Sequence, residues 1–137
     1  MKILLDTNVI LDVALKREPF YQAAAAVFKA SDSNDWRLFI TASIATDLYY
    51  VLRKEKGRDI AWQFIVQLLE CVDVCLVNKP ILEKALTSGF ADFEDAVQNA
   101  AADHEGMDII LTRNKADFSM SALPILTPAD FVSAHLE

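Results

Sequence analysis

The chain has 137 residues, of which 53% are hydrophobic, and its formal net charge is −7. This length suits a single domain over residues 1–137 with one substantial core, and the hydrophobic fraction excludes a disordered chain. The acidic balance excludes non-specific binding of nucleic acid through a broad basic surface, but it does not exclude a nucleic-acid substrate held through a divalent metal and a local basic patch.

The first half of the sequence predicts strands and helices in alternation. In chain order we expect a buried strand at residues 2–5, a helix at 7–15, an alanine-rich helix begun by Pro19 that runs through 22–30, a short strand at 38–40, and helices at 43–56 and 59–70. Asp6 or Thr7 lies near the cap of the first helix, and Gly57 closes the helix at 43–56.

The second half continues this alternation. We expect a strand at 72–77, a helix that starts at Pro80 and ends near Gly89, an alanine-rich helix at 92–105, strands at 108–111 and 124–126, and a final helix that begins at Thr127-Pro128 and runs through His135. Strands that alternate with one or two helices predict an α/β fold with a mainly parallel sheet covered on both faces.

Cysteine usage and hydropathy exclude several classes of protein. Cys71 and Cys75 are the only cysteines, and with the distant His104 and His135 they offer too few ligands for a zinc site. No segment approaches the roughly 18 apolar residues of a membrane span, and the N-terminal apolar run meets Asp6, so it is not a signal peptide. We therefore expect a cytoplasmic protein with reduced thiols.

Acidic residues stand at four places where packing alone would not require them. Asp6 ends an apolar run, Asp47 borders the apolar face of its helix, Asp92 and Asp95 begin the second alanine-rich helix, and Asp117 follows a predicted strand. Because Asp6 and Asp117 both follow parallel-type strands, we expect them at the same end of the sheet. Carboxylates gathered there repel one another unless a cation intervenes, and such hard oxygen ligands suit Mg²⁺ or Mn²⁺.

Each acid also has a purely structural interpretation. Asp6 and Asp92 suit helix caps, Asp47 can pair through solvent with the basic residues that follow it, and Asp117 is at home in a turn. Taken singly, each of these structural interpretations is as good as a functional one. Taken together they are weaker, because they do not explain why several acids are expected at the same end of the sheet.

Three segments resemble the motifs of a known family. Residues 3–12 (ILLDTNVILD), 92–96 (DFEDA) and 112–118 (TRNKADF) resemble, in this order, the opening, central and late motifs of the PIN-domain metal-dependent ribonucleases. The resemblance is greatest to the toxin-like branch of bacterial toxin–antitoxin systems. One departure is that the second family acid is commonly glutamate, whereas this chain offers Asp47, which is one methylene shorter and could coordinate a metal through water.

The resemblance implies a three-layer α/β/α fold in which a short, mainly parallel central sheet is flanked by helices, with the acids at the carboxyl ends of the strands. Asp6, Asp95 and Asp117 would then be the central metal-binding acids. Asp92 would be a further ligand, and Asp47 would complete the catalytic group.

Five further residues near these acids are candidates for supporting roles. By the same resemblance, Asn8 and Asn114 would orient water or phosphate, and Thr112 would support the site by hydrogen bonds. Local positive charge is needed to bind a polyanion, so we expect Arg113 or Lys115 to touch phosphate. The resemblance as a whole implies a Mg²⁺- or Mn²⁺-dependent endoribonuclease that acts on RNA, is neutralised by an antitoxin protein, and forms a homodimer.

Other functions remain open from the sequence. A haloacid-dehalogenase-type phosphatase also starts with a strand-end aspartate, but it carries a second acid where this chain has Asn8. A phosphoacceptor receiver domain needs a late strand-end lysine, which Lys115 matches poorly. A catalytically weak or inactive PIN-like module that binds RNA or protein, or a domain whose main role is assembly with an antitoxin, is compatible with the acids.

Overall fold

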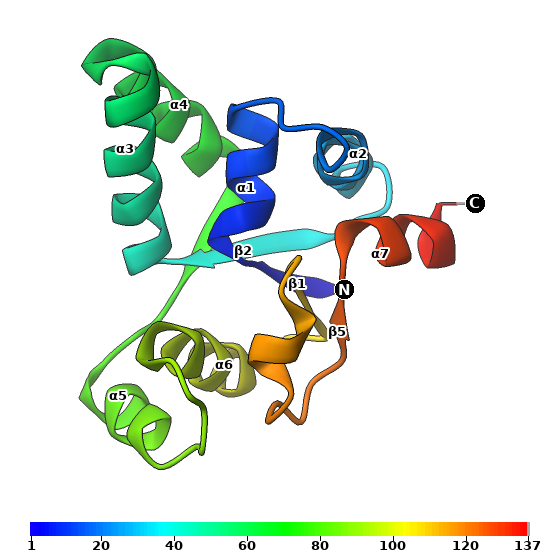
Figure 1. Ribbon diagram of the computed structural model, residues 1–137. Coiled ribbons are helices and arrows are strands. Elements are labelled where there is room, and N and C mark those ends of the chain that lie inside the picture. The colour runs from blue at the N-terminus through cyan, green and yellow to red at the C-terminus, as the bar shows by residue number, and fades with distance from the viewer. Residues whose placement is uncertain (137) are drawn as a thin grey trace.

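A five-stranded parallel sheet forms the centre of the fold (Figure 1). The computed structural model describes residues 1–136. The strands are β1 (Lys2–Leu5), β2 (Arg37–Thr41), β3 (Val72–Cys75), β4 (Ile109–Leu111) and β5 (Ile125–Leu126). They lie in the order β3-β2-β1-β4-β5 and pair in parallel throughout. The strand order reverses at β1, and in such sheets ligands bind beyond the carboxyl ends of the strands at this switch.

Helices cover both faces of this sheet (Figure 1). One face carries α1 (Thr7–Ala14), α2 (Tyr21–Ser31), α3 (Ala42–Lys56), α4 (Arg58–Cys71) and α7 (Pro128–His135). The other face carries α5 (Lys79–Leu86) and α6 (Phe93–Glu105), which contact each other closely. The three-layer α/β/α arrangement predicted from the sequence is therefore confirmed.

The central strand β1 is buried on both sides. Ile3 and Leu5 belong to the core beneath α1 to α4, whereas Leu4 between them belongs to the core beneath α5 and α6. All three side chains are inaccessible to solvent. Successive residues of a strand point to opposite faces, so a strand covered on both sides needs an unbroken apolar run. This packing fixes the position of Asp6, the residue that follows.

The predicted elements are found within a few residues of their expected bounds, with three differences. The second helix begins at Tyr21 rather than at Pro19, because the N–H groups of Phe20 and Tyr21 both donate to the carbonyl of Arg17 and close a turn first. The strand β3 ends at Cys75, two residues early. A 3₁₀ helix, η1 (Lys115–Phe118), follows β4 and was not predicted.

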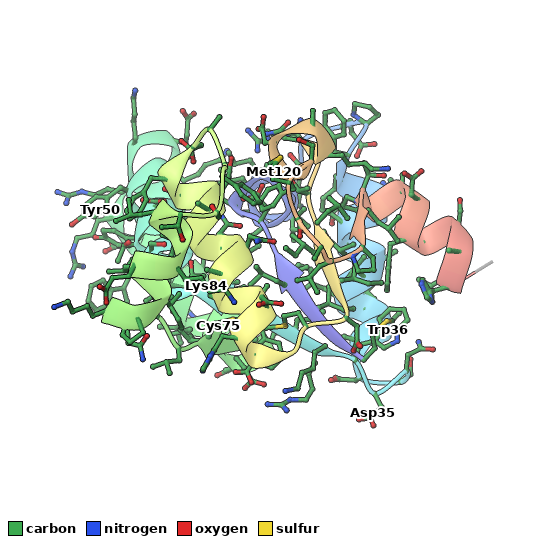
Figure 2. The ribbon with its side chains drawn as sticks, turned by 90° about the horizontal axis from the view of Figure 1, so that it is seen from below. Asp35, Trp36, Tyr50, Cys75, Lys84 and Met120 are labelled. Atoms are coloured by element: carbon green, nitrogen blue, oxygen red, sulfur yellow. The ribbon has the colours of Figure 1, made fainter. Side chains whose placement is uncertain are left out.

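The hairpin of α3 and α4 leaves an apolar surface uncovered. Tyr50, Trp62, Val66 and Leu69 are all exposed, and with Tyr49 they line a hollow of about 370 Å³ between the two helices. Figure 2 places Tyr50 at the outer margin of the molecule. We call these five residues the α3–α4 surface.

Among residues 1–136, none of the helices combines the length and the apolar composition that a membrane span requires.

Candidate active site

Asp6 lies at the switch of the sheet, directly after β1, and caps α1. Its side chain is nearly buried, and its two oxygens accept four hydrogen bonds. Oδ1 accepts from the backbone N–H of Thr7 at 2.7 Å and from Nε2 of Gln98 at 3.2 Å. Oδ2 accepts from Oγ1 of Thr112 at 2.7 Å and from Nδ2 of Asn8 at 3.3 Å. A buried carboxylate with donors on both oxygens is compensated for its lost water and fixed in orientation.

The end of β4 is tied to the start of α1 around this carboxylate. Thr112, which is fully buried, donates to Asp6 and accepts from the backbone N–H of Asn114 at 3.0 Å. Asn8 accepts from the backbone N–H of Arg113 at 3.2 Å. Thr112 and Asn8 therefore hold Asp6 and the loop after β4 as one unit.

Three more acids surround Asp6. Asp92 caps α6 by accepting from the backbone N–H of Asp95 at 3.0 Å. Burial, and after it the neighbouring carboxylates of Asp6, Asp92 and Asp117, together raise the pKa of Asp95 from 3.8 to about 6. Asp6 follows β1 and Asp117 lies in η1 after β4, and these two strands pair in parallel as neighbours. Acids from three separate parts of the chain therefore lie near one edge of the sheet, and their role as metal ligands stays a prediction.

Glu94 also belongs to this group, although the sequence analysis did not single it out. Burial and then a hydrogen bond with Asp47 raise the pKa of Glu94 to about 7, with smaller contributions from the Asp47, Asp6 and Asp92 carboxylates. Glu94 therefore joins Asp47 on α3 to the acids of α6. Its signal in the sequence was its place between Asp92 and Asp95, since successive residues in the first turn of a helix point toward different neighbours.

Gln98 is a second residue that the sequence analysis missed. It lies one turn beyond Glu94 on α6, is almost wholly buried, and donates to Asp6. Its Oε1 is buried without a hydrogen-bond partner among residues 1–136. A lone glutamine in an alanine-rich helix gives no sign of a partner 92 positions away.

The two cations that were expected to touch phosphate are already paired with acids. Arg113 donates from Nε to Oδ2 of the fully buried Asp12 at 2.7 Å, and its guanidinium lies 4.0 Å from the ring centre of Phe20. Nζ of Lys115 is 3.8 Å from Oδ2 of Asp130, in an exposed pair. Arg113 therefore has a structural role, and Lys115, whose exposed pair is weak, is the freer of the two.

The donor set of the site suits a hard divalent cation. Asp6, Asp92, Asp95 and Asp117 offer only carboxylate oxygens, and their mutual repulsion raises the pKa of Asp95. Among residues 1–136, however, no three histidine, cysteine, aspartate or glutamate side chains already stand in a metal-holding arrangement. Asp92 and Asp117 are exposed and Asp95 is half-buried, so their side chains have room to change rotamer.

Comparison with known proteins identifies the family of this chain. The family model described as PIN domain matches residues 2–116. The chain belongs to the PIN-domain family. It is 27% identical over 135 residues to ribonuclease VapC1 of Aquifex aeolicus (strain VF5). The alignment covers 95% of this chain and 92% of that protein. This PIN domain is thus related to the VapC toxins of toxin–antitoxin systems.

Solved structures show the same PIN fold. VapBC-1 from nontypeable Haemophilus influenzae superimposes with a TM-score of 0.73 and 18% identity, covering 94% of this chain and 99% of that one. A toxin–antitoxin complex from Klebsiella pneumoniae gives a TM-score of 0.69 and 21% identity, covering 92% and 97%.

The raised pKa values predict that the metal-free protein becomes less stable as pH rises. The folded chain raises the pKa of Glu94 from 4.5 to about 7 and that of Asp95 from 3.8 to about 6. The stability that these two groups contribute is therefore complete below about pH 4 and is lost as the pH rises through the folded values. In EDTA, the thermal midpoint should fall between pH 5 and pH 8. The Asp95→Asn variant should show a shallower fall. A wild-type midpoint that is flat or rises over this range would contradict the prediction.

Proposed function

We propose that this PIN domain is an endoribonuclease that hydrolyses RNA phosphodiester bonds with Mg²⁺ or Mn²⁺. The observation that carries the proposal is the convergence of Asp6, Asp92, Asp95 and Asp117 at the switch of the sheet, where Asp95 experiences the charge of the other three. RNA as the substrate is supported by the relative of 27% identity, which is named a ribonuclease.

We assign the metal to Asp6, Asp95 and Asp117, with Asp92 as a further ligand. A bound divalent cation would lower the pKa of water and neutralise charge that develops on the phosphate. The chain contributes the orientation of Asp6, which four donors fix before any substrate arrives. Preorganised groups of this kind do not have to reorient during the reaction.

The remaining predicted residues take supporting roles in this proposal. Asp47 is catalytic through its charge at the edge of the acid group, where it is joined to Glu94. Asn8, Thr112 and the backbone of Asn114 keep Asp6 in place. Lys115 contacts phosphate, while Arg113 supports the loop after β4 through its backbone and its bond to Asp12.

We also propose that the chain is the toxin of a toxin–antitoxin pair and that it forms a homodimer. The antitoxin partner is supported by the solved neighbour described as a toxin–antitoxin complex. The exposed α3–α4 surface supports association in general, since contiguous apolar patches on a soluble domain commonly mark protein contacts.

A catalytically weak or inactive PIN-like module that binds RNA or protein is the second candidate. The observation that favours it is the absence, within residues 1–136, of three acids already placed to hold a metal. Cleavage activity separates the two candidates, because both predict binding and only the first predicts turnover.

The purified chain should cleave structured RNA in Mg²⁺ or Mn²⁺ and lose this activity in EDTA. Activity should return when metal is added back in excess. If a small DNA-binding protein is encoded beside the chain and is its antitoxin, adding that protein should lower the activity. Cleavage that survives EDTA would exclude the metal mechanism. Binding of RNA without cleavage in either metal would favour the inactive module.

A further inference from the structure

A second hollow opens beside the acids, on the other side of the sheet from the α3–α4 surface. It has a volume of about 370 Å³ and lies between the start of α3, the segment after β3, and the helices α5 and α6. Its lining includes Ser43, Leu82, Phe93, Glu94 and Val97. We call it the α3–α6 pocket. Its volume lies within the range of about 300–1,000 Å³ that is typical of small-molecule sites.

We propose that the α3–α6 pocket binds one nucleobase of the RNA, next to the phosphate that is cleaved, with Phe93 stacked on the base. This inference rests on the proposed function, because it names how the same site recognises its substrate. It assigns a specificity-determining role to Phe93, which lies outside the acid group.

Phe93 has the exposure and position that base stacking requires. It is the first residue of α6, and 52% of its surface is accessible to solvent, so it does not serve as a core residue. Leu82 of α5 is also exposed across the pocket, while Val97 at its floor is buried. A flat aromatic ring beside aliphatic walls offers a base one stacking face and an apolar edge, and exposed aromatic rings next to a strand-binding groove commonly serve this purpose.

Glu94 joins the pocket to the acids. Glu94 lines the pocket, its carboxyl group hydrogen-bonds with Asp47, and it precedes Asp95 in the chain. Phe93 itself is the neighbour of Asp92 in the chain. A polynucleotide whose phosphate lies at the acids therefore carries an adjoining base past Phe93, because base and phosphate belong to the same or the next nucleotide.

The charge of the pocket identifies its occupant as a base. The acids beside the pocket, Asp47, Asp92 and Asp95, disfavour a second phosphate or an acidic peptide, whereas a nucleobase is neutral. The Glu94 carboxylate and the Ser43 hydroxyl can accept hydrogen bonds from base N–H groups. Adenine, cytosine and guanine present exocyclic amino groups and uracil does not, so we expect the pocket to prefer the amino-bearing bases.

Sequencing the cut ends of a randomised RNA pool tests the assignment. Wild-type chain in Mg²⁺ should show a base preference at one position beside the cut, with uracil disfavoured. Phe93→Ala should lower kcat/KM for the preferred sequence roughly tenfold, the scale of one aromatic–base stack, and should weaken the preference because the base is no longer held against Glu94 and Ser43. Phe93→Trp should keep both. Leu86→Ala, which removes a more exposed apolar side chain from the neighbouring helix α5, should leave the preference unchanged. An identical cleavage pattern in wild type and Phe93→Ala would overturn the proposal while leaving the nuclease assignment standing.

A binding measurement tests the pocket without any turnover. The indole fluorescence of Phe93→Trp is titrated in EDTA with adenosine, cytidine, guanosine and uridine, and the wild-type signal from Trp36 and Trp62 is subtracted. A saturable change that is weakest for uridine would support the pocket even if no RNA is cleaved. No saturable change with any of the four nucleosides, or a change only when the partner protein is added, would overturn it and assign the hollow to another ligand.

Discussion

Replacing Asp6 by asparagine is expected to abolish RNA cleavage and to leave the chain folded. The carboxylate supplies charge to the proposed metal site at the switch of the sheet. A bound cation contributes several kcal/mol to the stabilisation of such a transition state, so the expected loss is roughly a thousandfold in cleavage rate, at about 1.4 kcal/mol for each factor of ten.

The surroundings of Asp6 explain why the fold should survive this change. Asparagine caps helices about as well as aspartate, so the hydrogen bond from the Thr7 N–H to Oδ1 is retained. The side-chain NH2 group of the asparagine takes the place of Oδ2, which accepts hydrogen bonds in the wild type. Because NH2 donates, it needs an acceptor at this position. The Thr112 hydroxyl, which lies at this position, can rotate to accept from it, and Gln98 keeps its hydrogen bond to Oδ1.

Cleavage rate and thermal unfolding should be measured together on the same preparations. Asp6→Asn should unfold near the wild-type midpoint, whereas Asp6→Ala should be less stable by more than about 1 kcal/mol, because it loses the cap and also leaves the buried donors of Gln98 and Thr112 unpaired. Asp59→Asn is a matched control, since this carboxylate lies in the first turn of α4 and is almost fully exposed. Wild-type cleavage by Asp6→Asn would remove Asp6 from the mechanism.

The local signals of the sequence were sufficient for much of the fold. The unbroken run before Asp6 predicted a strand covered on both sides, and the structure buries its residues 3–5 completely. Apolar spacing predicted α3 and α4 correctly as helices, but it did not predict that Tyr50 and Leu69 remain exposed. Periodicity reports a helix, whereas burial depends on whether another element covers its face.

The local sequence predicted only those residues of the candidate site that stand at unusual positions. Asp6 interrupts an apolar run and Asp92 starts a helix, so each attracts notice on its own. Gln98 and Glu94 stand at ordinary helical positions, and their meaning comes from neighbours on other elements. The strand order, which brings β4 beside β1, is set by tertiary packing and decides which distant residues meet.

The ion pair of Arg113 could not be predicted for the same reason. The sequence placed a cation directly after β4, beside a predicted acid, and suggested that Arg113 or Lys115 contacts phosphate, which stays a prediction. The structure adds that Arg113 is paired with Asp12, which is fully buried on α1 and 101 positions away. Asp12 lies within the opening motif and, like Asp6, interrupts an apolar run, but its local sequence does not identify Arg113 as its partner.

Replacing Asp12 by alanine is therefore expected to cause the largest loss of stability among single changes to the charged residues near the site. Asp12 accepts from Nε of Arg17 at 2.9 Å, and from Nε and Nη2 of Arg113 at 2.7 and 3.2 Å. Without it, two cations face each other beside the core and have no counter-ion. Breaking a buried pair in this way costs about 3–5 kcal/mol. Because both arginines keep some contact with solvent, we expect about 3 kcal/mol.

Denaturant unfolding of a small set of variants measures this loss. Asp73→Ala is the matched control: it also breaks an aspartate–arginine pair, with Arg37 at 3.0 Å, but both partners are exposed, so the cost should not exceed about 1 kcal/mol. The Asp12→Ala/Arg113→Ala double variant should be more stable than the sum of its single changes predicts, since it removes one of the stranded cations together with the acid. Equal losses in the free energy of unfolding for Asp12→Ala and Asp73→Ala would show that burial does not make the Asp12–Arg113 pair more important for stability.

The same variant separates stability from catalysis at this end of the sheet. Asp12 holds the side chain of Arg113, and the backbone N–H of Arg113 donates to Asn8, which in turn donates to Asp6. Loss of Asp12 should therefore loosen the loop after β4 without removing any acid of the site. At a temperature where Asp12→Ala is still folded, cleavage should be reduced but should still require metal, in contrast to the complete loss expected for Asp6→Asn. The charge of Asp6 and the anchoring of its neighbours by Asp12 are distinct contributions, and only the first is chemical.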